Sequence, residues 1–425
     1  MSTTTLAVHP KLAALFRALD EAGARWCVLR GETDLLDPAG DVDLLIAPED
    51  ARHLRESARR LGFARLPAWG YGSHAFFLAY DASRDLWLKL DAVTELAYGP
   101  GFTLPTGAEA ECLARRRHID GVPVLHESDA LWTLLLHRLL DKNGPPPAQD
   151  AARLAELASH GHTDGPLERL VASLCPEGWD TARITHAVER EDWAALAELA
   201  TALRASWREA RRADVRRREV AGRFWHWSGK WLRLSRRAGV SVALLGPDGA
   251  GKSTLTAELE SSFYLPVRSV YMGLYQNPAP RKARRLRPVP RSAKRVATQW
   301  GRWLEGAYHR RRGRLVVFDR YTYDALVPNR FRHGMRGRAR RWVLARSCPP
   351  PDLAVLLDAP GDILYSRKGE HDLVLLERQR EAYRALLPRL PRSVVVDASD
   401  DPTRVRAEVT AAIWREYVRR WSPRD

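Results

Sequence analysis

The chain has 425 residues, of which 45% are hydrophobic and 28% are charged, and its formal net charge is +16. This length allows two or three globular domains, each with its own core. The sequence excludes a protein built on membrane spans, because no stretch approaches the roughly 20 apolar residues that a membrane helix needs. Its start, MSTTTLAVHPKLAALF, does not follow the pattern of a secretory signal, and its four cysteines lack zinc-ligand or redox spacing. A cytoplasmic location is therefore expected.

The first hundred residues mix helical and extended patterns. The predicted elements are, in order, a helix over 9–23, strands over 25–30 and 42–47, a helix over 48–63, and two strands over 74–81 and 86–93 that form a hairpin. This order predicts an α/β domain over residues 1–103. Residues 104–204, which are helical from about Glu127, are expected to form a helical subdomain packed on it.

Residues 205–238 are densely basic and include Trp225, Trp227 and Trp231. Basic residues among aromatic ones are typical of segments that bind single-stranded nucleic acid or lie on an anionic membrane. They also occur in solvated connecting helices whose tryptophans dock on a neighbouring domain. The net positive charge can indicate a polyanionic partner, or it can result from a general preference for arginine in the sequence. The sequence leaves these alternatives open.

From residue 239 to 425 short apolar runs alternate with helical segments. The runs cover 241–246, 269–273, 314–320, 353–358 and 393–398. Five such runs separated by helices predict a parallel five-stranded sheet with helices on both faces. The fold class expected for the whole chain is therefore α/β, with several domains.

A glycine-rich motif follows the first of these runs. The stretch GPDGAGKST completes the pattern G-x-x-x-x-G-K-[ST] between a predicted strand and a predicted helix, which is the position that phosphate binding requires. Its glycines let backbone N–H groups turn toward phosphate oxygens, and the helix N-terminus adds partial positive charge. The residues predicted to bind the nucleotide are Gly246, Asp248, Gly249, Gly251, Lys252, Ser253 and Thr254. Lys252 is expected on the β- and γ-phosphates of ATP and Ser253 on Mg²⁺.

The later strands indicate what the nucleotide is used for. Asp319 and Arg320 end the third apolar run, at the sheet edge where ligands of open α/β sheets bind. There the carboxylate is suited to an acceptor hydroxyl or a metal-bound water, and the guanidinium to the migrating phosphate. A basic turn, YSRKGEHD, and a helix follow the fourth run and are suited to close over the phosphates as a lid.

These motifs give a specific resemblance over residues 240–420. GPDGAGKST, GRLVVFDRY, PDLAVLLDAP, RKGE and REAY resemble the thymidylate kinase family in order and approximate spacing. The resemblance implies a Mg-ATP-dependent kinase in which Asp319 and Arg320 position acceptor and phosphates. It also implies that the lid is formed by Arg367 and Lys368, with Arg378 and Arg380 as further candidates.

The expected acceptor is a small, nucleotide-like molecule. Where thymidylate kinases carry a Glu-Pro-Gly turn, this chain has a long basic insert that includes residues 280–296, so the acceptor side differs and thymidylate itself does not follow. Arg295, Gln299 and Arg302 lie on the helix that would face the acceptor, where a surface role is the alternative.

The front half contains a second pattern. Asp41 and Asp43 project from one face of a strand, and Asp91 joins them if its strand pairs nearby. Three carboxylates around one point repel one another unless cations lie between them, which is the arrangement of two-metal nucleotidyl transfer. Lys89 shares the face of Asp91 and is a candidate triphosphate contact. Isolated histidines at 74, 118 and 137 are assigned structural roles.

The first hundred residues resemble the DNA polymerase beta-like nucleotidyltransferases. Gly31 matches the turn of that superfamily, and Asp41, Asp43 and Asp91 match its metal ligands, whereas Glu32 departs from the usual Gly or Ser. The resemblance implies a metal-dependent nucleotidyltransferase. An inactive metal-binding relative and coincidental surface aspartates stay open as alternatives.

Three hypotheses follow for the whole chain. The first is a bifunctional enzyme in which a nucleotidyltransferase-like domain is joined to a kinase. The second is a kinase that acts on nucleic-acid ends, held by the basic regions. The third is a kinase whose front half is a regulatory module without chemistry. The oligomeric state does not follow from the sequence.

Overall fold

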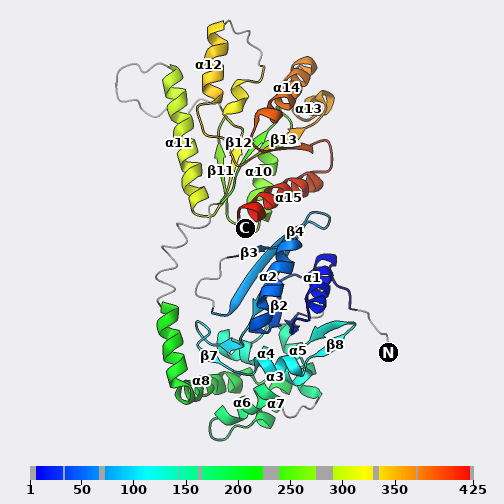
Figure 1. Cartoon of the computed structure of the whole chain (residues 1–425), viewed down its shortest axis with the longest axis vertical. Coiled ribbons are helices and arrows are strands. Elements are labelled where there is room, and N and C mark those ends of the chain that lie inside the picture. The colour runs from blue at the N-terminus through cyan, green and yellow to red at the C-terminus, as the bar shows by residue number, and fades with distance from the viewer. Residues whose placement is uncertain are drawn as a thin grey trace. The chain divides into compact units, whose positions relative to one another are not determined.

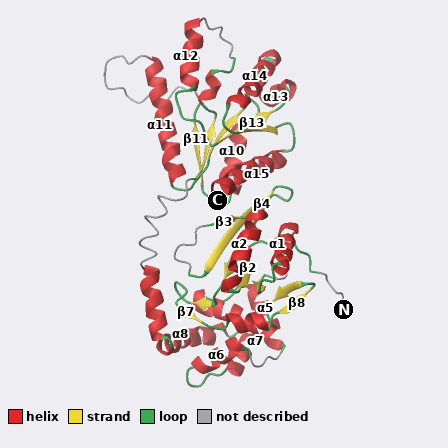
Figure 2. Ribbon diagram, viewed as in Figure 1, coloured by secondary structure: helices red, strands yellow, loops and turns green. Residues whose placement is uncertain are grey.

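The computed structural model of the chain describes residues 6–31, 34–66, 72–142, 144–160, 165–223, 239–273, 291–328, 335–369 and 372–421. It divides into two compact units. Unit 1 consists of Met1–Ala79 and Leu88–Trp231, and unit 2 of Tyr80–Trp87 and Leu232–Asp425. Both contain helices and strands (Figures 1 and 2). Among the described residues, no helix has the length and apolar character that a membrane crossing needs.

A mixed seven-stranded sheet forms the centre of unit 1. Its strands are β1 (Trp26–Arg30), β2 (Asp41–Ile46), β3 (Ala64–Arg65), β4 (His74–Asp81), β5 (Leu86–Val93), β8 (Arg117–Ile119) and β9 (Val122–Val124), in the order β3-β4-β5-β2-β1-β9-β8. β4 and β5 are neighbours across residues 82–85, so the predicted hairpin is confirmed. β2 runs parallel to β5 and antiparallel to β1. This central position of β2 brings its aspartates beside β5.

Helices cover this sheet and continue beyond it. They are α1 (Pro10–Glu21), the 3-10 turn η1 (Pro48–Asp50), α2 (Ala51–Arg60), α3 (Glu109–Ala114), α4 (Glu127–Leu136), a π-helical turn η2 (His137–Asp141), α5 (Ala148–Ser159), α6 (Pro166–Leu174), α7 (Thr181–Glu189) and α8 (Trp193–Ala210), followed by helical residues 212–223. A small two-stranded ribbon, β6 (Ala97–Tyr98) and β7 (Leu104–Pro105), lies between β5 and α3 in sequence. Residues 104–126 were predicted to belong to the helical subdomain. In the structure they form the strands β7, β8 and β9 besides α3.

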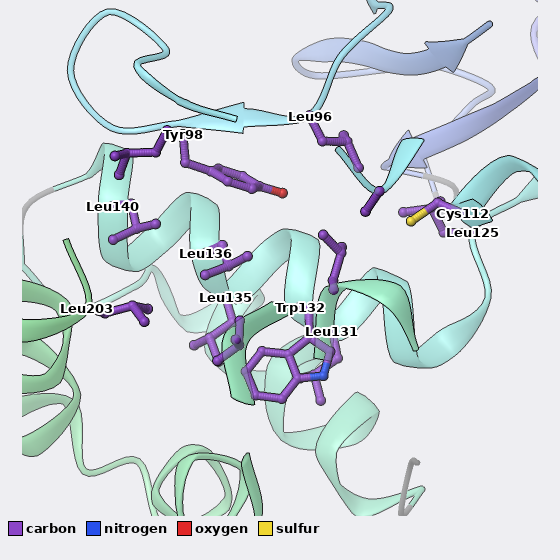
Figure 3. Packing of buried hydrophobic residues seen from close by; sticks show 14 of the residues in the cluster. Leu96, Tyr98, Cys112, Leu125, Leu131, Trp132, Leu135, Leu136, Leu140 and Leu203 are labelled. Atoms are coloured by element: carbon purple, nitrogen blue, oxygen red, sulfur yellow. The ribbon is translucent and has the colours of Figure 1, made fainter. Parts of the chain in front are cut away.

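The helices of unit 1 share one apolar core with the sheet. Trp132 of α4, one of its tryptophans, is 1% exposed and lies among leucines of the same helix (Figure 3). Trp207 of α8 is fully buried, and its indole N–H donates to the carbonyl of Pro105 at 3.1 Å. A buried indole is stabilised when its N–H finds a partner, so this contact fixes α8 on β7. Trp225, Trp227 and Trp231 of the basic linker lie outside the described residues.

Unit 2 is built on a five-stranded parallel sheet, as predicted. β10 (Ser241–Leu245), β11 (Val267–Tyr271), β12 (Leu315–Asp319), β13 (Leu353–Asp358) and β14 (Ser393–Asp397) lie in the order β11-β12-β10-β13-β14. β10 is fully buried between β12 and β13. The order of the strands in the sheet therefore differs from their order in the sequence, and β10, the strand before the glycine motif, is central.

Helices lie on both faces of this parallel sheet (Figure 1). They are α10 (Lys252–Ser262), α11 (Arg291–Arg311), the 3-10 turn η3 (Thr322–Ala325), α12 (Met335–Ala345), α13 (Gly361–Lys368), α14 (Leu373–Leu386), the 3-10 turn η4 (Leu387–Arg389) and α15 (Pro402–Trp421). Trp303 of α11 and Tyr383 of α14 pack in one cluster with Ala243 and Leu245 of β10. Because strand side chains alternate, Val242 and Leu244 face the other side, where α10 and α15 pack together. Of the basic insert, residues 274–290 lie outside the described part, and from 291 it belongs to α11.

A buried ion cluster holds α15 at the amino end of the sheet. Asp352, directly before β13, has an 8% exposed side chain and accepts from Arg310 of α11 at 2.9 and 3.1 Å and from Arg420 of α15. It also accepts from the backbone N–H and the hydroxyl of Ser241, each at 2.8 Å. One carboxylate therefore connects two helices and two strands.

Replacing Asp352 with alanine is expected to destabilise unit 2 strongly, because it leaves two arginines without their buried partner. We expect a loss of about 3–5 kcal/mol of unfolding free energy in urea denaturation. As a control, Asp400→Ala breaks the more exposed pair with Arg404 and should cost no more than about 1 kcal/mol. Similar losses in the two variants would contradict the anchoring role.

Candidate functional site

The glycine motif forms a loop whose backbone packs closely against its neighbours. Gly246, Gly249 and Gly251 have φ angles of +144°, +91° and +83°. A Cβ atom at Gly246 would lie 2.7 Å from the carbonyl oxygen of Leu357, and one at Gly249 would lie 2.5 Å from that of Leu364. Both distances are shorter than real Cβ contacts, so any side chain would push the loop outward. The glycines are required by the close approach of the backbone.

The position of this loop directs backbone N–H groups at one point. It leads from the central strand β10 into the N-terminus of α10, which begins at Lys252. Gly251 is the N-cap residue of α10, and Thr254 is exposed in its first turn. Backbone N–H groups at a helix N-terminus and a loop without side chains form a suitable surface for anionic oxygens.

Lys252 lies buried on the loop, with 6% of its surface exposed. Its ammonium donates to the carbonyls of Gly246 at 2.8 Å and Pro247 at 2.7 Å. Burial is the main cause that lowers the pKa of Lys252 to about 8, and the nearby guanidinium of Arg320 lowers it further. Carboxylates in the site oppose this shift without cancelling it. An added anion beside the ammonium would restore an ordinary pKa.

The two residues predicted at the end of the third strand lie beside the loop. Asp319 ends β12, and its Oδ2 accepts from the hydroxyl of Ser253 at 3.0 Å. Arg320 follows with φ of +69°, an uncommon conformation for a residue with a side chain. Its guanidinium forms an ion pair with Asp248 of the loop. The structure thus brings together the residues predicted from the glycine motif and from the β12 edge.

Two further residues of this cluster were not among the predicted site residues, although Tyr383 ends the REAY motif. Asp324, in the turn η3, has a 9% exposed side chain with Oδ2 3.8 Å from Arg320, and its Oδ1 accepts from the hydroxyl of Tyr383 at 2.9 Å. Burial raises the pKa of Asp324, while Arg320 and Lys252 act to lower it. For Asp248 burial also acts upward, but Arg320 and Lys252 outweigh it and the pKa is lowered. The only sequence signal for Asp324 is its position four residues after Arg320.

The predicted lid residues lie on α13 and α14, and two of them contact the carboxyl ends of β13 and β14. Arg367 and Lys368 are exposed at the end of α13, and Arg367 donates to the carbonyl of Ala398 at 2.7 Å. Lys368 is near enough to Asp248 to help lower its pKa. Arg380 forms a bidentate pair with Asp358, with distances of 2.8 and 3.1 Å, and Arg384 adds a bond of 2.6 Å. Arg378, on α14 like Arg380 and Arg384, is exposed.

The three residues predicted to face the acceptor lie on α11 and differ in their exposure and contacts. Arg295 is exposed, whereas Gln299 is 3% exposed and its Oε1 has no hydrogen-bond partner within the described part of the chain. Arg302 donates to the carbonyl of Gly273 at 3.1 Å and lies over the ring of Tyr271, with 5.7 Å to the ring centre. Burial raises the pKa of Tyr271, and Asp319 and Arg320 act on it in opposite directions, so this ring lies near the β12 edge.

In unit 1 the three predicted aspartates lie on neighbouring strands. β2 and β5 pair in parallel with Asp43 opposite Asp91 and Asp41 opposite Lys89. Burial raises the pKa of Asp43, Arg30 lowers it, and Asp91 and Asp41 raise it again. The expected pairing of the two strands is therefore confirmed, and the three carboxylates are close enough to influence one another.

Each of these carboxylates already has a basic partner. Asp41 accepts from Lys89 at 2.6 Å, Asp43 pairs with Arg30 at 2.8 Å, and both oxygens of Asp91 lie 2.9 Å from Nδ1 of His74. Within the described ranges, no group of three or more Asp, Glu, His or Cys side chains is arranged to hold a metal ion. In this structure the three carboxylates are paired with basic side chains, and Mg²⁺ would have to displace Lys89, Arg30 and His74 to use them for two-metal transfer. Gly31 has φ of +81°, and Glu32 after it lies outside the described residues.

The three histidines singled out in the sequence differ in their burial and contacts. His74 packs against Phe102, with 4.3 Å between ring centres, and its contact with Asp91 connects it to the aspartate cluster. His137 lies in the π-helical turn, with Nδ1 2.8 Å from Asp141, and burial lowers its pKa. His118 is exposed on β8. The link between His74 and Asp91 was not expected, since 17 residues separate them.

Gly249→Ala tests whether the loop depends on its close packing. The added methyl group would meet the Leu364 carbonyl in a backbone conformation that disfavours side chains, so we expect a loss of about 2 kcal/mol or more in unfolding free energy. Gly301→Ala is the matched control, because no described residue has an atom within 4 Å of a Cβ atom there, and alanine favours the helix. Equal stability of the two variants in urea denaturation would contradict the packing argument.

No protein-family model matches the chain, and no curated protein matches it significantly in sequence.

Proposed function

We propose that unit 2 is an ATP-dependent kinase resembling thymidylate kinase, which transfers the terminal phosphate of Mg-ATP to a nucleotide or related small acceptor. The observation that carries this proposal is the glycine loop between β10 and α10, packed against the carbonyls of Leu357 and Leu364, with the Lys252 ammonium on it. The position of the loop on the central strand, beside Asp319 and Arg320, supports the same proposal.

The residues of the site have distinct roles in this proposal. Lys252 has three N–H donors, of which two are on loop carbonyls, so it can turn to the β- and γ-phosphates. Arg320 stabilises the migrating phosphate by charge. Asp319 orients the acceptor oxygen, and the exposed Arg367 and Lys368 cover the phosphates.

The proposed reaction is a displacement at the terminal phosphorus of ATP. An acceptor oxygen forms a bond to this phosphorus, the bond to the β,γ-bridging oxygen breaks, ADP leaves, and the acceptor proton is released to a carboxylate or to water. Ser253 is the residue that would hold Mg²⁺, which would neutralise charge on the phosphates. Positioning and charge stabilisation by the protein account for most of the catalysis.

For unit 1 we propose a nucleotidyltransferase-like module. The register that places Asp43 opposite Asp91 supports this proposal. The pairing of all three aspartates with basic residues supports the alternative, a regulatory module without chemistry.

Lys252→Ala tests the kinase proposal at its centre. Loss of a charge-assisted contact to phosphate should weaken binding of a fluorescent ATP analogue by about tenfold to a hundredfold and abolish phosphate transfer to a panel of nucleoside monophosphates. The wild-type affinity should also fall as the pH rises through about 8, because Lys252 then loses the proton that a bound triphosphate requires.

The pH profile of the Lys252→Ala variant should be flat in this range, which makes it the control for other titrating groups. Equal turnover by wild type and variant would contradict the assigned site. Binding of single-stranded nucleic acid whose log affinity falls by about 0.7 per phosphate contact per log unit of salt would favour the nucleic-acid end kinase.

Asp41→Asn tests the proposal for unit 1. With radiolabelled nucleoside triphosphate and Mg²⁺, the full chain is expected to transfer a nucleotide, and the variant is expected to have lost this transfer because a carboxylate of the cluster is removed. The same transfer by both proteins, or none by either, would contradict the transferase proposal and leave the regulatory module.

A further inference from the structure

We propose that Asp324 and Tyr383 are positioning residues that fix the orientation of Arg320 and connect it to α14, the helix after the predicted lid. The inference rests on the proposed kinase function, because Arg320 is the residue that would stabilise the migrating phosphate. It adds two residues with no role in the glycine motif or in the Asp319–Arg320 pair.

Arg320 needs support from its surroundings. Its φ of +69° is unfavourable for a residue with a side chain and persists only where neighbouring groups determine the conformation. Its guanidinium has an acidic neighbour on each of two elements, Asp248 in the phosphate loop and Asp324 in η3. The first belongs to the nucleotide-binding loop itself. The second is the group that supports Arg320 independently of the loop.

Asp324 is suited to this supporting role. Only 9% of its side chain is exposed, and its Oδ2 faces Arg320 at 3.8 Å and accepts no hydrogen bond from the residues that the structure describes. A buried carboxylate with one open oxygen needs a cation nearby, and Arg320 and Lys252 are the cations that counter the effect of burial on its pKa. Attraction to this oxygen limits the positions that the guanidinium can take.

Tyr383 fixes the other oxygen of Asp324. Its hydroxyl donates to Oδ1 at 2.9 Å, and the tyrosine is only 4% exposed within the core cluster of unit 2. Because Oδ1 is held by this bond, rotation of the carboxylate is restricted in the arrangement that directs Oδ2 at Arg320. The removal of this one hydroxyl therefore frees the carboxylate without removing its charge.

The same contact connects Arg320 to the helix that follows the lid. One turn before Tyr383, Gln379 of α14 donates to the carbonyl of Pro328 at 3.0 Å, beyond η3. Arg380 and Arg384 attach the helix to Asp358 at the end of β13. A displacement of α14 would therefore move the support of Arg320.

The first test measures the guanidinium directly, without nucleotide or metal. The full chain is treated with phenylglyoxal, and modification of Arg320 is followed by peptide mass spectrometry. Because ion pairing protects a guanidinium, Tyr383→Phe and Asp324→Asn should each raise the rate at Arg320 by about threefold or more. The rate at the exposed Arg404 should not change, and Tyr308→Phe, on a 55% exposed tyrosine, is the matched control variant.

The second test measures turnover with Mg-ATP and water as the acceptor. Tyr383→Phe should lower kcat about tenfold and leave KM for ATP within about twofold, because the loop still binds the phosphates. In an Arg320→Ala background, Tyr383→Phe should have no further effect on kcat. A purely structural hydroxyl would lower stability in both backgrounds and would not follow this pattern.

Two results would overturn the inference, and they are distinguishable. If hydrolysis depends on Lys252 but Tyr383→Phe changes neither labelling nor kcat, or still lowers kcat without Arg320, the positioning role is wrong and the kinase proposal stands. If hydrolysis is the same in Lys252→Ala and wild type, both fall.

Discussion

The close approach of the glycine loop to its neighbours is the constraint on which the rest of the candidate site depends. Gly246 lies against the carbonyl of Leu357 at the end of β13, and Gly249 against that of Leu364 in α13. The loop therefore follows the surface formed by the adjacent strand and helix. This contact determines where α10 begins, and with it the positions of Lys252 and Ser253.

The carboxylates of the two candidate sites are paired with basic groups in different ways. In unit 2, Asp248 and Asp324 both lie near Arg320, and Asp319 bonds a neutral hydroxyl, so one guanidinium is shared between acidic groups. Shared cations can be redistributed when an anionic ligand arrives, at small cost. In unit 1 each aspartate of the cluster has its own basic partner from a different segment of the chain. Lys89 and Arg30 balance the charges of Asp41 and Asp43 there, and Asp91 contacts His74.

Much of the fold of unit 2 could be predicted from the sequence, because five apolar runs and a glycine motif between strand and helix have strong local signals. Asp319 could be placed beside the loop for the same reason, since carboxyl ends of parallel strands share one edge. The contacts that could not be predicted join distant residues. Tyr383 is 59 residues from Asp324, and Arg380 was assigned to the lid although it pairs with Asp358. In unit 1, the sequence stated the pairing of the strands of Asp43 and Asp91 only as a condition, which the structure meets. The partners Arg30 and His74 could not be predicted, because nothing local specifies them.

The most direct measurement is a crystal structure of the full chain with a non-hydrolysable ATP analogue. We expect a triphosphate along residues 246–254. The Lys252 ammonium, which now donates to the carbonyls of Gly246 and Pro247, should then donate to phosphate oxygens. A loop without nucleotide at saturating analogue, or a triphosphate bound elsewhere with Lys252 still on those carbonyls, would contradict this expectation.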